Sequence, residues 1–202
     1  FVGVCLVLTY FAGSSGMAFW REWLLFRNST DFGVKDPQFN LDISFFAFKL
    51  PIFQALIGWG ISTLILAALA SAFVHYMYGG IRTAVQTDRT TVAARVQISI
   101  LLGLIVLLKA VAYWFDRFAL ALKESTLITG LKFTDVNALL PAKAILAAIA
   151  VVCSLLFFAN IIRRSWLLPA AGSALLVVSS VLIAGLYPTA IQQFQVKPSE
   201  SS

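Results

Sequence analysis

Five long apolar stretches decide what this chain can fold into. A helix rises about 1.5 Å per residue and the hydrocarbon core of a bilayer is about 30 Å thick, so about 20 apolar residues suffice for one crossing. Hydrophobic residues occupy 60% of the 202 positions and charged residues only 12%, whereas an ordinary soluble domain has about 25% charged residues. The sequence therefore predicts an all-α, polytopic transmembrane helix bundle. Its five spans are predicted at residues 1–20, 51–78, 96–115, 144–162 and 166–187.

Residues at the span ends support this division. Pro51 and Pro169 fall in predicted first turns, where a missing N–H costs little, and Gly79 follows the second span as a helix C-cap does. Thr90 or Thr91 is the predicted N-cap of the third helix. Because the number of spans is odd, the two ends of the chain should lie on opposite sides of the membrane.

Basic residues in the short loops predict the orientation. The loop from 79 to 95 holds three arginines against one aspartate, and the link between the fourth and fifth spans holds two more arginines. Short loops rich in Lys and Arg stay on the cytoplasmic side. The two longer loops, 21–50 and 116–143, are nearly balanced in charge and should face outward. The topology-setting residues are therefore Arg82, Arg89, Arg95, Arg163 and Arg164.

Lys109 is the one ionisable residue well inside a predicted span. A charge in hydrocarbon costs at least about 2.5–3.5 kcal/mol unless it is paired or reaches the interface. Tyr113 lies one helical turn away and Asp116 two turns away on the same face, so these three residues form a candidate pairing group. A structural lysine that snorkels or pairs is the favoured interpretation, and a substrate or ion-pathway lysine is the alternative.

The two outward loops contain the most unusual sequence. After a turn marked by Pro37, residues 36–45 alternate polar and apolar side chains, which predicts a short extended segment against the membrane face. Residues 134–141 predict a capped helical turn at the interface. The loops are either polar lids over the bundle or a docking surface for an extracytoplasmic partner. The candidate docking residues are Asp36, Pro37, Phe39, Asp42, Thr134, Asp135 and Asn137.

Residues for other chemistry are few. Cys5 and Cys153 lie in apolar stretches without metal-ligand spacing and are expected to pack as small hydrophobic residues. His75 is the only histidine, and no Walker loop, dinucleotide-binding glycine pattern or zinc-protease motif occurs. The net charge of +6 comes from basic residues beside the spans, which argues against nucleic-acid binding. We therefore expect no catalytic residue, metal site or cofactor in this chain, whereas bound lipids are compatible with it.

Several separated motifs resemble a known family. In chain order they are FGVKDPQF at 32–39, FKLP at 48–51, GGIR at 79–82, TDVN at 134–137 and YP at 187–188. Together they resemble uncharacterised protein family 0182, whose members are bacterial multi-pass membrane proteins of actinobacteria and cyanobacteria. The resemblance implies that these are spans three to seven of a seven-span region. It also implies that residues 188–202 begin an extracytoplasmic tail leading to a soluble domain, and it supplies no catalytic residues.

These observations leave three classes of function. The first is an integral membrane anchor or scaffold subunit that presents its outer loops and an extracytoplasmic domain to envelope or membrane-complex partners. The alternative is a transporter or lipid-handling protein that uses Lys109 near the outer leaflet, although no span shows the paired Gly or Pro interruptions of a midplane transport site. An envelope enzyme comes last. The expected location is the bacterial cell membrane, with residue 1 cytoplasmic and the C-terminal tail outside.

Overall fold

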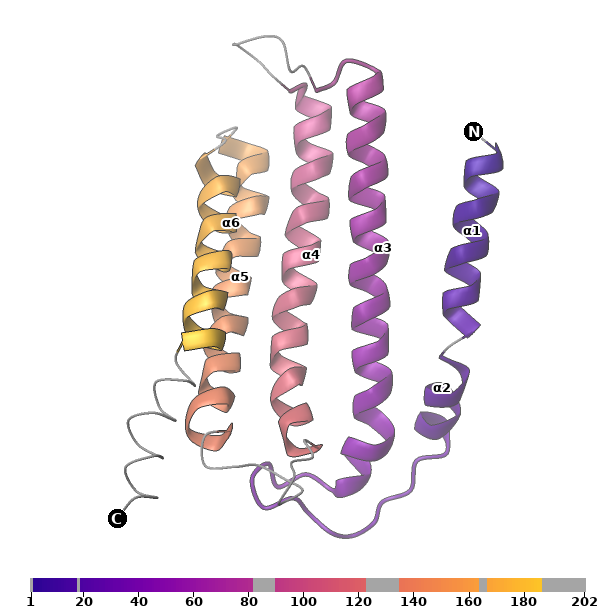
Figure 1. Cartoon of the computed structure of the whole chain (residues 1–202), viewed down its shortest axis with the longest axis vertical. Coiled ribbons are helices and arrows are strands. Elements are labelled where there is room, and N and C mark those ends of the chain that lie inside the picture. Colours follow the sequence, from indigo (N-terminus) through magenta and orange to yellow (C-terminus); the bar gives the residue numbers. More distant parts are fainter. Residues whose placement is uncertain (1, 18, 82–89, 123–134, 164–166, 187–202) are drawn as a thin grey trace.

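The fold is a set of long helices that stand side by side and alternate in direction along the chain (Figure 1). The computed structural model describes residues 2–17, 19–81, 90–122, 135–163 and 167–186. In these ranges the chain is mainly helical, and its β-type pairing is limited to two isolated bridges. The structure confirms the predicted all-α transmembrane helix bundle.

Each of the five predicted spans contains a helix. These helices are α1 (Val2–Met17), α3 (Leu50–Met77), α4 (Val92–Ala119), α5 (Leu140–Arg163) and α6 (Leu167–Ser179). Shorter helical segments accompany them: α2 (Trp20–Arg27), η1 (Phe45–Lys49), η2 (Leu120–Leu122), η3 (Asp135–Leu139) and η4 (Ser180–Leu186). The η1 segment runs directly into α3, η3 runs into α5, and η4 continues α6.

Three helical segments are long and apolar enough to cross a membrane. They are Phe45–Met77 with 33 residues, Val92–Leu122 with 31 and Asp135–Arg163 with 29. The apolar helix Leu167–Ile183 is shorter, and α1 has 16 residues, which corresponds to about 24 Å. The long segments exceed their predicted spans because η1, η2 and η3 and the first turn of α4 continue the helices beyond the predicted stretches.

The ends of α3 and α4 show why these helices stop and start where they do. The Thr91 side chain accepts a hydrogen bond from the Ala94 N–H at 3.3 Å, so the predicted N-cap of α4 is confirmed. Gly79 has a φ of +70°, a left-handed conformation that terminates α3. The next N–H, that of Gly80, donates to the His75 carbonyl oxygen.

The core lies between α4 and α5. Ser154 Oγ donates to the Gly103 carbonyl oxygen at 2.9 Å, and Asn160 Nδ2 donates to Ser99 Oγ at 2.9 Å. A Cβ added at Gly103 would lie 2.6 Å from the Phe158 ring, so the close approach of the helices requires glycine there. Small residues and hydrogen bonds between helices stabilise membrane bundles, because burial against a helix brings little gain over burial in lipid.

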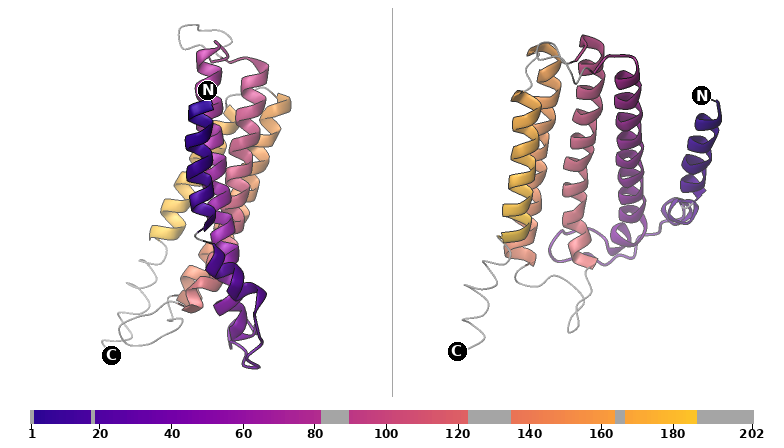
Figure 2. Two further views of the ribbon diagram at one scale, coloured as in Figure 1. Left: turned by 90° about the vertical axis from the view of Figure 1, so that its right-hand side faces the viewer. Right: turned by 45° about the horizontal axis from the view of Figure 1, so that its top comes forward.

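Helix α1 stands apart from α3 and the remaining helices (Figures 1 and 2). Its apolar side chains are exposed, with exposed fractions of 66% for Leu6 and 74% for Tyr10. The packed part of the described bundle is therefore α3 to α6, and the candidate surfaces lie at the two ends of these helices.

Candidate functional site

Residues 31–44 form a compact loop that joins α2 to α3 at one end of the bundle (Figure 1). We call this loop the platform. Asp36 N–H donates to the Leu41 carbonyl oxygen at 2.8 Å, and Asp36 Oδ1 accepts from the N–H groups of Gln38 and Phe39 at 2.9 and 2.8 Å. These bonds bend the chain back on itself, so a closed turn stands where the alternating pattern predicted an extended segment.

The carboxylate of Asp42 fastens the two sides of the platform. Its Oδ1 accepts from the N–H groups of Ser44 at 2.8 Å and Phe32 at 3.1 Å, and its Oδ2 accepts from the Gly33 N–H at 2.8 Å. The Ser44 hydroxyl and N–H, followed by the N–H groups of Phe32 and Gly33, lower the pKa of Asp42 from 3.8 to about 2. The carboxylate is therefore ionised at neutral pH, as its role as an acceptor requires.

Aromatic rings hold the platform against the helices. The ring centroid of Phe39 lies 5.0 Å from that of Phe118 near the end of α4, and the centroid of Phe32 lies 5.4 Å from that of Phe48 in η1. Phe46, also in η1, is buried and lies 6.0 Å from Phe39. Centroid distances of about 4.5–7 Å are those of favourable aromatic pairs. The platform is thus an ordered part of the bundle end.

The platform combines four of the predicted docking residues with apolar side chains that sequence reasoning missed. Asp36, Phe39 and Asp42 are half-buried in the turn, and Pro37 is exposed at its tip. The missed residues are Phe32, Val34 and Ile43, whose exposed fractions are 51%, 56% and 42%. No local pattern indicates them, because their exposure follows from the bonds of Asp42 to the N–H groups of Phe32 and Gly33, ten and nine residues earlier.

The remaining predicted docking residues belong to the second loop. Asp135 is buried and Asn137 is exposed, and both lie in η3, which is continuous with α5. The expected interfacial turn is therefore an extension of the long helix Asp135–Arg163. Thr134 lies outside the described residues.

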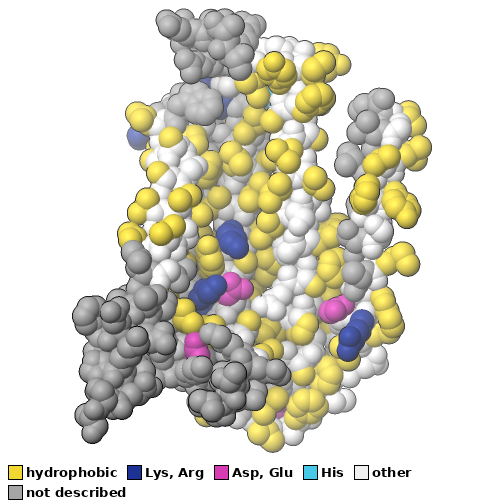
Figure 3. All heavy atoms as spheres, in the orientation of Figure 1, with side chains coloured by type: hydrophobic (Ala, Val, Ile, Leu, Met, Phe, Trp, Pro, Cys, Tyr) yellow, Lys and Arg dark blue, Asp and Glu magenta, His cyan; other side chains and the backbone are white. Residues whose placement is uncertain are grey.

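A charged group surrounds Tyr113 on the surface formed by α4 and α5. Lys109 Nζ lies 5.0 Å from the centroid of the Tyr113 ring. Asp116 Oδ2 pairs with Lys143 Nζ at 2.8 Å, and Lys143 Nζ also lies 5.4 Å from the Tyr113 centroid. Lys143, at the start of α5, is thus a further member that the sequence pattern did not indicate. Figure 3 shows basic and acidic side chains together on this otherwise hydrophobic face.

The two topology-setting arginines that the structure describes lie at the end of the bundle opposite the platform. Arg163 is exposed at the end of α5, whereas Arg95 is half-buried in the second turn of α4. The Nε atom of Arg95 is buried and has no hydrogen-bond partner. Arg82, Arg89 and Arg164 lie outside the described residues.

Candidate metal ligands are scattered. His75 Nε2 lies 3.0 Å from Gln97 Oε1, Cys5 is exposed in α1, and Cys153 is buried in α5. Among the residues that the structure describes, no three His, Cys, Asp or Glu side chains come close enough together to hold a metal ion.

Long apolar helices joined by an ordered loop define the class of this protein as a polytopic α-helical membrane protein. A family model described as "Uncharacterised protein family (UPF0182)" matches residues 1–202. The chain belongs to this family, in agreement with the resemblance of its motifs.

Relatives in three actinobacteria illustrate the match. A UPF0182 protein of Streptomyces coelicolor is 48% identical over 206 residues, which cover 100% of this chain and 21% of the relative. A UPF0182 protein of Nocardioides sp. is 51% identical over 99% of this chain and 20% of the relative, and one of Frankia alni is 47% identical over 100% and 20%. The chain therefore spans about a fifth of the length of these relatives. No solved structure matches it.

Proposed function

We propose that this chain is an integral membrane anchor and that its platform scaffolds an extracytoplasmic protein domain. The observation that carries this proposal is the exposure of Phe32, Val34 and Ile43 on a loop fastened by Asp42. Apolar side chains that protrude together from an ordered loop are typical of a docking surface.

The fastening itself favours docking. Binding to a flexible loop costs the entropy of ordering it, whereas a loop already held by hydrogen bonds and ring contacts avoids most of that cost. The platform also lies outside the apolar span that begins at Phe45, so its apolar side chains can contact a protein. The docked domain belongs either to the same polypeptide or to another envelope protein. The first is possible because the matched region is only about a fifth of the relatives' length.

A photo-crosslinking residue placed in the full-length protein in bacterial membranes tests this proposal. At position 34 the proposal predicts a crosslink to protein, and mass spectrometry of the product tells the same polypeptide from a different one. Leu69, which is 63% exposed on α3 within the apolar segment Phe45–Met77, provides the matched control and should crosslink to lipid. Crosslinks to lipid alone at both positions would contradict the scaffold.

A lipid-handling or transport function is the second candidate, and the position of Lys109 favours it. Its side chain is exposed on α4 within the segment Val92–Leu122, while the neighbouring Lys143 is occupied by Asp116. An exposed ammonium group in an apolar surface can bind the anionic group of a lipid or a substrate. Lys109→Met should then abolish lipid transfer or uptake by the full-length protein, and Lys35→Met, which removes an exposed lysine outside the apolar segments, serves as the control. Unchanged transfer in Lys109→Met would exclude this candidate.

A further inference from the structure

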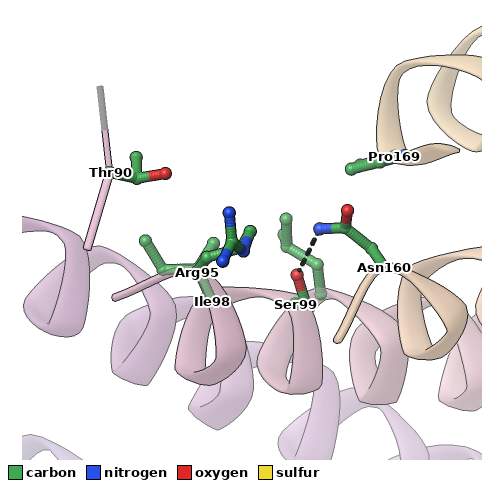
Figure 4. Close-up of a pocket in the computed structure, with 7 residues that line it drawn as sticks. Thr90, Arg95, Ile98, Ser99, Asn160 and Pro169 are labelled. Carbon is green, nitrogen blue, oxygen red and sulfur yellow. Dashed lines mark hydrogen bonds between the residues drawn. The ribbon is translucent and has the colours of Figure 1, made fainter. Parts of the chain in front are cut away.

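A cavity of about 120 Å³ lies between α4, α5 and α6 at the end opposite the platform (Figure 4). Its polar lining includes Arg95 and Ser99 from α4 and Asn160 from α5, and its apolar lining includes Ile98, Leu102 and Pro169. A water molecule takes up about 30 Å³ in the liquid, so the cavity holds more than one water. Its accessible lining is mostly apolar, so it suits a ligand with a large apolar part and a small polar group.

Two buried polar atoms at this cavity have no partner. Asn160 is 3% exposed, and its Nδ2 donates to Ser99 Oγ while its Oδ1 has no hydrogen bond. Arg95 Nε is likewise buried without a hydrogen bond. Figure 4 shows the Arg95 guanidinium and the Asn160 carboxamide on either side of Ser99, and all three residues line the cavity. Leaving such atoms unpaired costs about 1–3 kcal/mol each, so their presence in one cavity indicates that a ligand pairs with them.

The unpaired atoms define complementary ligand groups. Arg95 Nε–H requires an acceptor, and a guanidinium group fits a phosphate especially well because its planar fork of N–H donors can bind two phosphate oxygens at once. Asn160 Oδ1 requires a donor, which an alcohol hydroxyl supplies. Ser99 Oγ already accepts from Asn160, so its own proton remains available to the ligand.

The surrounding charges favour an anion. All carboxylates that the structure describes lie at or near the platform end. These residues are Glu22, Asp31, Asp36, Asp42, Asp116 and Asp135. The cavity instead lies where α4 and α6 begin and α5 ends, so the partial positive charge of two helix N-termini opposes the partial negative charge of one C-terminus.

We propose that this cavity is a binding site for a phosphate ester that carries a hydroxyl group. Arg95 and Ser99 bind the phosphate, and Asn160 Oδ1 accepts a hydrogen bond from the hydroxyl. The apolar wall of Ile98, Leu102 and Pro169 contacts the alkyl part of the ligand. Phosphatidylglycerol and free glycerol phosphate both have this chemistry, and the first brings a longer apolar part.

The test measures binding to the purified full-length protein in nanodiscs of phosphatidylcholine that contain a small fraction of a second lipid. Phosphatidylglycerol is compared with phosphatidylmethanol, which has the same charge but no headgroup hydroxyl, by native mass spectrometry of retained lipid. The site predicts about tenfold stronger retention of phosphatidylglycerol, the equivalent of one hydrogen bond to Asn160. Glycerol phosphate, titrated separately into nanodiscs of phosphatidylcholine alone, identifies a free phosphate ester as the ligand if it binds and the lipid does not.

Variants locate the binding. Asn160→Leu should abolish the difference between the two anionic lipids, and Arg95→Met should weaken retention of both by at least about tenfold. Arg163→Met removes an exposed arginine from the same end of the bundle and should leave retention unchanged.

Two outcomes overturn the proposal, and the first is measured on the wild-type protein alone. The first is equal retention of phosphatidylglycerol and phosphatidylmethanol by the wild-type protein without any binding of glycerol phosphate. The second is an equal loss of retention in Arg163→Met and Arg95→Met, because that result would mean that general surface charge attracts the lipid.

Discussion

The platform loop and the cavity at the opposite end of the bundle treat their polar groups in opposite ways. At the platform, the Asp42 carboxylate accepts three backbone N–H groups, and the Asp36 carboxylate accepts two. At the other end, Arg95 Nε and Asn160 Oδ1 are buried without partners. A complete hydrogen-bond set stabilises a structure, whereas an incomplete one lowers stability and is retained where it serves binding. The difference indicates that the platform presents a fixed surface and that the cavity awaits a ligand.

Removal of the Asp42 carboxylate should have the largest effect. In Asp42→Ala the N–H groups of Phe32, Gly33 and Ser44 all lose their acceptor, so the platform should open. Hydrogen exchange of these amides in the full-length protein should approach the rate of an unstructured loop. Asp31→Ala is the control, because the contact of Asp31 Oδ1 with Ser44 Oγ is 3.3 Å long. Continued protection in Asp42→Ala would show that the aromatic contacts alone hold the platform.

The next largest effect on stability is expected at the close contact between α4 and α5. Alanine at position 103 places a methyl group 2.6 Å from the Phe158 ring, and overpacking of this kind costs about 1–3 kcal/mol. Gly58→Ala in α3 is the control, because its Cβ meets nothing within 4 Å and alanine should gain about 1 kcal/mol of helix propensity. The thermal unfolding temperature in detergent should therefore fall in Gly103→Ala and rise in Gly58→Ala. Equal stabilisation by both would mean that α4 and α5 are less closely packed.

Removal of the polar pair at the cavity, Ser99 and Asn160, should cost little stability, in contrast to removal of the Asp42 carboxylate. With Ser99→Ala and Asn160→Leu combined, one internal hydrogen bond is lost together with the unpaired Oδ1. The free energy of unfolding without ligand should change by less than about 1 kcal/mol or should increase. A loss greater than about 2 kcal/mol would assign the pair to holding α4 and α5 together.

The pH dependence of the platform should be the smallest effect near neutrality. Because the folded platform lowers the pKa of Asp42 from 3.8 to about 2, ionisation of this carboxylate stabilises the platform above pH 3.8. This contribution is lost as the pH falls from 3.8 towards 2. Protection of the Gly33 amide, corrected for intrinsic exchange, should therefore be constant from pH 7 to pH 5 and should decrease below pH 4. A decrease centred near pH 5 would contradict the hydrogen-bond pattern around Asp42.

The sequence predicted the features that depend on neighbouring residues. Apolar length placed a helix in each predicted span, and the Thr91 cap followed from the residue type that precedes the apolar run. Contacts between distant residues could not be predicted in this way. Asp116 pairs with Lys143 from the next helix, and Asn160 bonds to Ser99, 61 residues away. The rotation of one helix against another decides these contacts, and the cavity depends on three helices at once.

The alternating pattern at residues 36–45 shows a different limit. Alternation favours an extended strand, but the Asp36 carboxylate offers the next N–H groups a closer acceptor, and a turn results. The competition between a side chain and a backbone partner is local, yet hydrophobic patterning does not describe it.

Cysteine accessibility in intact cells tests the central claim that the platform and the cavity lie on opposite sides of the membrane. Val34→Cys and Arg163→Cys, each exposed, are introduced one at a time into full-length protein that lacks its other cysteines, including Cys5 and Cys153. A membrane-impermeant maleimide should label Val34→Cys in intact cells and should label Arg163→Cys only after the membrane is permeabilised. Labelling of both positions in intact cells, or of neither, would contradict the account.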